Sequence, residues 1–164
     1  MSNGAWLNGC SGSSQAALIA RKPGSNTQYY IFTTDAQAAL GGQVCPFSYG
    51  GLSYSEVDMS VGNGTVTMKN TPLITPTAEK LTGIRLCDDN LWVITHGWNN
   101  NAFHAFKITS SGIVSTPVTS TVGPTHKDTG FCLGATGAVG EMKISPNGKK
   151  LAVWMSRKCD KCVT

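Results

Sequence analysis

Apolar and polar residues alternate over short stretches of this chain, which is the pattern of half-buried β-strands. The clearest stretch is residues 141–155, in which Met142 and Ile144 are separated by a charged residue and precede the turn sequence of residues 146–148, Pro-Asn-Gly. Proline fixes φ at the first central position of a turn, and glycine readily takes a positive φ. Apolar spacing resumes at Leu151, so the segment predicts a β-hairpin.

The same alternation predicts a series of short strands along the chain, separated by turns rich in Gly, Asn, Asp and Ser. No stretch has the spacing of an amphipathic helix. We expect strands at residues 16–20, 29–34, 52–59, 65–68, 81–86, 91–96, 102–109, 113–116, 141–145 and 150–155.

The strongest apolar strands recur at a nearly constant interval. Tyr29 and Leu91 are 62 positions apart (91 − 29), and Leu91 and Leu151 are 60 apart (151 − 91). Four antiparallel strands per interval are typical of a β-propeller blade. We therefore expect an all-β fold in one domain over residues 1–164, with blades at about 16–73 and 79–122 and a partial blade from 138.

About two and a half blades do not close a propeller, which typically has four to eight. Three arrangements are consistent with this number. The chain is a truncated part of a longer propeller, or it closes by homo-oligomerisation through open blade edges, or its sheets pack as a two-sheet sandwich.

Several short motifs resemble known propeller repeats. Residues 145–152 (SPNGKKLA) resemble the hairpin signature of WD40-like and TolB-like repeats. Four further segments, in their order, are similar to the N-terminal propeller of Bacteroidetes gliding-motility-associated, type IX-secreted surface proteins: residues 29–36, 57–60, 75–82 and 91–103. The resemblance implies a secreted or cell-surface location and a non-enzymatic module that scaffolds or binds protein or glycan. The chain departs from that family in its cysteines and in having no C-terminal sorting domain.

Composition supports a turn-rich all-β protein and argues against nucleic acid as a partner and against a membrane span. Charged residues make up 13% of the chain, against about 25% in typical domains. The net charge of +4 is dispersed except for a C-terminal group, and Trp154 is the only aromatic residue within that group, which argues against nucleic acid. No run of about 20 apolar residues predicts a membrane span. The basic group consists of Lys149, Lys150, Arg157, Lys158 and Lys161.

Six cysteines allow up to three disulfides, or alternatively free thiols in a reducing compartment. Cys159 and Cys162 form a single CxxC, and zinc binding together with His126 and Cys132 is an alternative, although zinc ribbons use two such pairs. We assign no metal site. The cysteines that we predict as disulfide candidates are Cys10, Cys45, Cys87, Cys132, Cys159 and Cys162.

Candidate catalytic groups are sparse. Glu56 and Asp58 lie on one face of a predicted strand about 7 Å apart, a pair that could serve glycoside hydrolysis but is more typical of a solvated sheet face. Residues 88–90, Asp-Asp-Asn, read as a turn rather than a cation site. If the hairpin is symmetric about Asn99 and Asn100, His96 faces Phe103 and His104 faces Thr95, so the two histidines lie on opposite faces and share no metal. We assign no catalytic residue and no cofactor.

The loop of residues 97–101 is the candidate ligand site. An aromatic ring beside carboxamides is a common arrangement for holding sugars. The alternative is that the tryptophan packs between blades and the asparagines form the turn. The candidate ligand-binding residues are Trp98, Asn99, Asn100 and Asn101. The function that we predict is a non-enzymatic extracellular or cell-surface module; the alternatives are part of a glycosidase-like propeller hydrolase and a subunit of a repetitive surface assembly.

Overall fold

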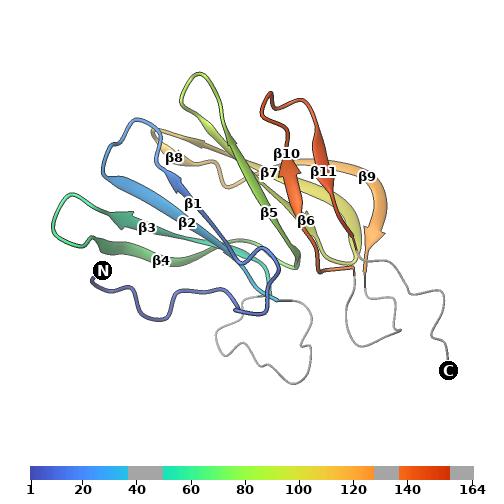
Figure 1. The fold of residues 1–164 in the computed structure, drawn as a ribbon, viewed down its shortest axis with the longest axis horizontal. Helices are drawn as coiled ribbons and strands as arrows, with labels where there is room; N and C mark the ends of the chain where they lie inside the picture. Colours follow the sequence, from blue (N-terminus) through green and yellow to red (C-terminus); the bar gives the residue numbers. More distant parts are fainter. Residues whose placement is uncertain (37–49, 128–136, 156–164) are drawn as a thin grey trace.

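The computed structural model describes residues 1–36, 50–127 and 137–155. Over these residues the chain is all-β, and its strands form three antiparallel sheets that follow one another along the chain (Figure 1). The predicted all-β, antiparallel fold class is therefore confirmed. The described residues form no closed propeller.

The first sheet is a meander in which each strand pairs with the next one along the chain, in the order β1-β2-β3-β4. Alternation explains the register: Tyr30 and Phe32 of β2 are buried on one face, while Ile19 of β1 lies opposite Ile31 on the other. Its strands are β1 (Ala17–Arg21), β2 (Gln28–Thr34), β3 (Leu52–Asp58) and β4 (Thr65–Ile74).

The second sheet has the order β5-β6-β7, and two strands, β8 and β9, share the far side of β7. The predicted hairpin register is confirmed, because His96 lies opposite Phe103 and Thr95 lies opposite His104. The strands are β5 (Thr77–Arg85), β6 (Leu91–Gly97), β7 (Asn100–Thr109), β8 (Gly112–Ile113) and β9 (Val118–His126).

The outer strand of this sheet differs from the sequence prediction. A strand at 113–116 was expected, whereas β8 is only two residues long and β9 supplies the outer edge, pairing Val118 with Ala105 and His126 with Asn100. Gly123 has φ +79, which lets the strand continue past an irregularity in register. The Gly-Pro sequence at 123–124 reads as a turn in sequence, and this is why the strand was missed.

The third sheet is the predicted hairpin, β10 (Met142–Ile144) and β11 (Leu151–Val153), with Met142 opposite Val153. Its turn has the expected chemistry. Gly148 takes φ +70, and its N–H donates to the carbonyl of Ser145 at 2.8 Å. Asn147 fixes the turn further, since its Oδ1 accepts from the Lys149 N–H at 3.1 Å.

The main core lies between the facing sides of the first two sheets. Its members are the alternate residues of neighbouring strands, which is the arrangement that period-2 patterning predicts. Burial of each such large side chain stabilises the fold by about 1.5–3 kcal/mol. The core residues are Tyr30, Phe32, Leu52, Leu81, Leu91, Val93, Phe106 and Ile108.

Strand β5 lies between the other two sheets and contacts β1, β2 and β10 (Figure 1). One side chain joins all three sheets at this place: Gln15 Oε1, just before β1, accepts from the Leu81 N–H of β5 at 3.0 Å and from the Met142 N–H of β10 at 2.8 Å. Gln15 Nε2 also donates to the Met142 carbonyl at 3.2 Å. The first strands of the three sheets are thereby held side by side.

Candidate functional site

The Trp98 turn connects β6 to β7 and is fixed at both ends by backbone hydrogen bonds. The N–H of Trp98 donates to the carbonyl of Pro76 at 3.1 Å, and the N–H of Asn99 donates to the carbonyl of His126 at 2.8 Å. Asn99 has φ +61, a conformation that asparagine tolerates better than most residues. The turn is thus anchored to the segment before β5 and to the end of β9.

The carboxamides of this turn are partly engaged with the backbone. Asn100 Nδ2 donates to the Trp98 carbonyl at 3.1 Å and Asn100 Oδ1 accepts from the Ala102 N–H at 2.8 Å. Asn101 Nδ2 lies 3.4 Å from the Gly123 carbonyl. Trp98 is half-buried and Asn99 is exposed. Asn99 and Asn100 therefore have a turn-forming role, and a sugar at Trp98 stays a prediction.

An apolar groove lies on the second sheet beside this turn, bounded on its other side by β11. It consists of two adjoining cavities of about 440 and 300 Å³. Both are lined by Phe103, Val122 and Val153. The larger cavity is also lined by Trp154, and the smaller one by Val118 and Leu151. We call this surface the β11 groove.

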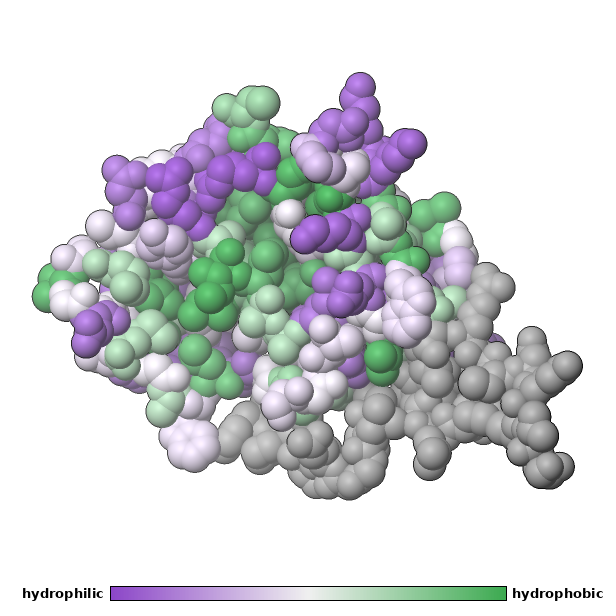
Figure 2. All heavy atoms as spheres, viewed as in Figure 1, coloured by the Kyte–Doolittle hydropathy of each residue, from purple (hydrophilic) through white to green (hydrophobic). Residues whose placement is uncertain are grey.

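The β11 groove carries large apolar side chains that are open to solvent. Val118, Val122 and Trp154 are 58%, 61% and 58% exposed. Hydrophilic residues cover the β10–β11 turn near one end of the groove, at the upper right in Figure 2. Contiguous exposed apolar surface bordered by polar residues marks interaction sites in soluble proteins. The groove is therefore a candidate surface for binding another molecule.

Two buried histidines lie side by side at the groove, and one of them lines the larger cavity. The rings of His96 and His126 stack with centroids 3.6 Å apart and planes 13° apart, and Phe103 meets His96 edge-on at 4.5 Å. His96 Nδ1 lies 2.7 Å from the Gly97 carbonyl and donates to it. His126 lines the larger cavity, while His104 on the other face contacts Thr119. Sequence reasoning placed His96 correctly but missed its partner, which lies on the unpredicted strand.

Both rings of the pair are neutral at pH 7. Burial lowers the pKa of His96 to about 4 and that of His126 to about 3, with nearby Lys80 acting in the same direction. His96 Nε2 and His126 Nδ1 have no hydrogen-bond partner among the described residues. Stacked rings direct their in-plane lone pairs along separate planes, so the pair is poorly placed to share one metal ion.

Metal binding gains no support from the described part of the chain. Within it, no group of three or more His, Cys, Asp or Glu residues could hold an ion. The alternative of zinc at His126 with Cys132, Cys159 and Cys162 depends on cysteines that lie outside the described residues.

Lys80 is a fully buried cation that the sequence analysis did not single out. Its Nζ donates to the carbonyls of Gly137, Ala138 and Val139 at 3.0, 2.9 and 3.0 Å. Burial lowers the pKa of Lys80 to about 8, with Glu79 opposing the shift. At pH 7 the ammonium is therefore charged and uses its three hydrogens to fasten the segment before β10 to β5.

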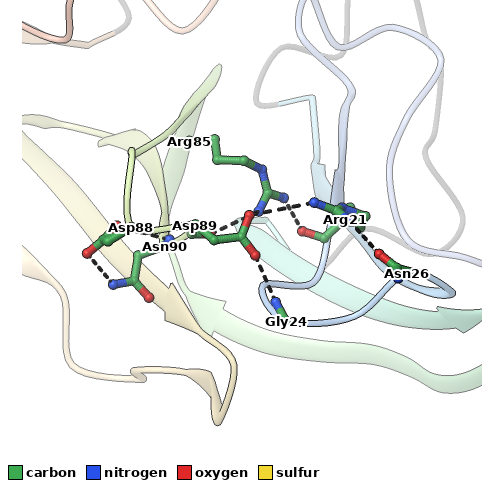
Figure 3. Close-up of polar contacts among 7 residues, drawn as sticks. All are labelled: Arg21, Gly24, Asn26, Arg85, Asp88, Asp89 and Asn90. Atoms are coloured by element: carbon green, nitrogen blue, oxygen red, sulfur yellow. Dashed lines mark hydrogen bonds and ion pairs between the residues drawn. The ribbon is translucent and has the colours of Figure 1, made fainter.

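The turn of residues 88–90 has a structural role rather than the form of a cation site (Figure 3). Asp88 accepts from the Asn90 N–H at 3.1 Å, as expected for a turn. Asp89 Oδ1 contacts Arg85 Nη1 at 2.6 Å and Arg21 Nη2 at 3.6 Å, and Asp89 Oδ2 accepts from the Gly24 N–H at 2.8 Å. The Gly24 hydrogen bond and then Arg85 lower the pKa of Asp89. The carboxylate links the β1–β2 and β5–β6 turns.

Glu56 and Asp58 occupy the same face of β3, as predicted, and both are half-exposed. The backbone N–H of Ser60 donates to Asp58 Oδ1 at 2.8 Å, and hydrogen bonds from Ser60 lower the pKa of Asp58. A glycosidase pair needs one carboxyl that stays protonated. Asp58 is instead stabilised as a carboxylate within its own turn, which does not favour that chemistry.

The cysteine prediction is corrected at one position. Cys87 is a free, exposed thiol, so it is not a disulfide cysteine here. It lies in the β5–β6 turn, where the described residues place no second cysteine beside it. Cys10 is buried. Cys45, Cys132, Cys159 and Cys162 lie outside the described residues, so the remaining pairing stays a prediction.

Comparison with protein-family models, curated proteins and solved structures found no match for this chain. The resemblance to WD40-like repeats and to gliding-motility-associated surface proteins therefore stays a prediction. No helix in the described part of the chain has the length and apolar character needed to cross a membrane.

Proposed function

We propose that this chain is a non-enzymatic, propeller-type module that binds a protein partner through the β11 groove. The observation that carries the proposal is the groove itself: Val118, Val122 and Trp154 are each more than half exposed beside cavities of about 440 and 300 Å³. Apolar area of this kind gains free energy when a partner covers it.

The propeller-type arrangement is supported by the order of the sheets. Each sheet begins with a strand, β1, β5 or β10, that contacts or is joined through Gln15 to the first strand of the next. In a propeller, successive sheets meet in this way around a central axis. The third sheet has only two strands over the described residues, whereas the first has four, so part of the second sheet remains uncovered beside β11.

A protein partner is favoured over a glycan because polar side chains beside the groove already form hydrogen bonds within the protein. The carboxamide of Asn100 is engaged with the backbone on both its oxygen and its nitrogen. The groove is lined mainly by aliphatic and aromatic side chains, which match apolar side chains of a protein better than sugar hydroxyls. An extracellular or cell-surface location, which the family resemblance implies, fits such a module and remains part of the proposal.

Site-specific photo-crosslinking tests the proposal in the native host. A benzophenone side chain at Val122, in the groove, is expected to crosslink to another protein. The matched control is Val61, which is 79% exposed in the β3–β4 turn and lies away from the groove. Protein crosslinks at position 122 and none at 61 support the proposal. Equal crosslinking at both positions, or none at either, contradicts it.

A further inference from the structure

Among the described residues β11 pairs only with β10, and its other edge borders the groove. In an antiparallel ladder the N–H and C=O of one residue point to the same side, and successive residues alternate. Lys150 accepts from the Ser145 N–H and the Trp154 N–H donates to Glu141, so the even-numbered residues of β11 bond to β10. The backbone groups of Leu151 and Val153 must therefore point away from β10, toward the groove.

The cavities of the groove follow β11 at intervals of two residues. Leu151 and Val153 line the smaller cavity, and Val153 and Met155 line the larger one. Alternate side chains of a strand are about 7 Å apart and point to one face. A strand placed beside β11 would therefore direct successive alternate side chains into the two cavities while its backbone paired with Leu151 and Val153.

Among the described residues, the outer edges of β4 and β9 have protective features that the edge of β11 lacks. The edge of β4 is covered by the N-terminal segment, because Ser2 pairs with Thr65 and the Val66 N–H donates to the Ser2 carbonyl. The outer strand β9 contains Pro124, which removes one backbone donor. Proteins usually protect exposed edges by such means. The sequence of β11 is Leu-Ala-Val, without proline or charge.

Positive charge at one end of the groove indicates which end of a bound strand would be acidic. Lys149 and Lys150 are exposed where β11 begins. The ion pairs found among the described residues involve Asp89 with Arg21 and Arg85, so neither lysine is neutralised there by an acidic side chain. An acidic group on a bound strand would be attracted to this end.

We propose that the β11 groove binds an extended strand of a partner protein, with apolar residues at alternate positions and an acidic end beside Lys149 and Lys150. This inference rests on the proposed function and specifies the partner's form. Binding adds a third strand to the β10–β11 hairpin, so that main-chain hydrogen bonds supply affinity and the two cavities select the alternate side chains.

The test uses the full chain and a fluorescein-labelled peptide of two aspartates followed by four valine–threonine repeats. Fluorescence anisotropy is expected to show saturable binding. A peptide with the same composition, but with four valines followed by four threonines, is expected to bind at least tenfold more weakly. Replacing the aspartates by lysines is expected to weaken binding in low salt. Equal binding of the alternating and blocked peptides overturns the proposal.

Protein variants localise the site. Val122→Asp, on the exposed wall of the groove, is expected to raise the Kd at least tenfold, and Val61→Asp is the matched control with no change expected. Leu151→Pro removes one N–H that faces the groove and leaves the bonds of β11 to β10, so it is expected to weaken binding as well. Circular dichroism verifies that each variant is folded. Binding that withstands Val122→Asp overturns the proposal.

The remaining outcomes separate this inference from the proposed function. If neither peptide binds while crosslinking at position 122 persists, strand addition is wrong and the protein-binding groove stands. If sedimentation velocity shows instead that the wild-type chain self-associates and that Val122→Asp abolishes this, the occupant is a second copy, and a strand from another protein is excluded.

Discussion

The imidazole rings of His96 and His126 stack at 3.6 Å, although the residues are separated by 30 positions (126 − 96) along the chain. The contact joins the end of β6 to the end of β9 beneath the β11 groove. Burial keeps both rings uncharged at pH 7, and two stacked imidazolium ions would repel each other in this site. The histidine pair at the groove therefore depends on its protonation state.

The histidine pair predicts a loss of stability in acid. Each ring has a lower pKa in the folded protein, about 4 for His96 and about 3 for His126, than the ordinary value of 6.5. The unfolded chain therefore binds more protons below pH 6.5, so the free energy of unfolding falls as the pH decreases from 6.5 toward 4. We expect a loss on the order of 3 kcal/mol for each ring, measured by urea unfolding across this pH range.

The contribution of the pair is isolated by substituting phenylalanine. In His96→Phe and His126→Phe, a ring remains to stack but does not titrate, so the fall in stability between pH 6.5 and 4 is expected to be smaller than in the wild type. His104→Phe is the control on the opposite face, where burial lowers the pKa of a half-buried ring. An unchanged pH profile in both test variants would show that the pair does not control acid stability.

Lys80 is expected to be a strong determinant of stability. Lys80→Met keeps the length of the side chain but removes the ammonium donor from the carbonyls of Gly137, Ala138 and Val139, of which Ala138 keeps the Glu79 N–H. An unsatisfied buried acceptor costs about 1–3 kcal/mol, so we expect a total loss of roughly 2–4 kcal/mol by urea unfolding. The matched control is Lys69→Met, because Lys69 makes two exposed hydrogen bonds and its loss should cost less than about 1 kcal/mol. Equal stability of the two variants would refute this role of Lys80.

Gln15 is expected to stabilise the meeting of the three sheets. Gln15→Met preserves approximate volume but removes the acceptor shared by the Leu81 and Met142 N–H groups. We predict a loss of about 1–3 kcal/mol and faster hydrogen exchange at those two amides. Gln28→Met is the control, because that half-buried side chain has no hydrogen bond to another described residue. Unchanged exchange at Leu81 and Met142 would mean that Gln15 does not hold β5 and β10 together.

Local patterning was sufficient to predict most strands and one register. The alternation in residues 91–96 and 102–109, together with the asparagines between them, predicted that His96 faces Phe103, and the structure confirms it. The hairpin at residues 141–155 was predicted equally well, because proline and glycine specify its turn. In both places the information lies within a single hairpin.

The beginning of β5 shows where local patterning fails. The strand was expected from residue 81 but begins at Thr77, and Glu79 and Lys80 within it are 1% and 0% exposed. Charged residues are rarely buried unless paired. The groups that satisfy them are distant in sequence: Ser14 donates its N–H to Glu79 Oε2, and residues 137–139 accept from Lys80. No local pattern reveals such partners.

The candidate site was only partly predictable for a similar reason. The Trp98 turn was found from its composition, but the β11 groove depends on β9, whose exposed residues are mostly valine, threonine and serine and include a Gly-Pro pair. A β-branched pattern at Val118 and Val122 was a usable signal. That these residues lie opposite β11 follows from tertiary packing and could not be read from the sequence.

The central claim is that the edge of β11 beside the groove is open and receives a partner strand. Amide hydrogen exchange of the full chain, followed by NMR with and without the alternating peptide, tests it most directly. In the free protein, Leu151 and Val153 should exchange quickly while Ala152 and Trp154, bonded to β10, are protected, and the peptide should protect Leu151 and Val153. Protection of Leu151 and Val153 before the peptide is added, or no change on saturation with it, would contradict the account.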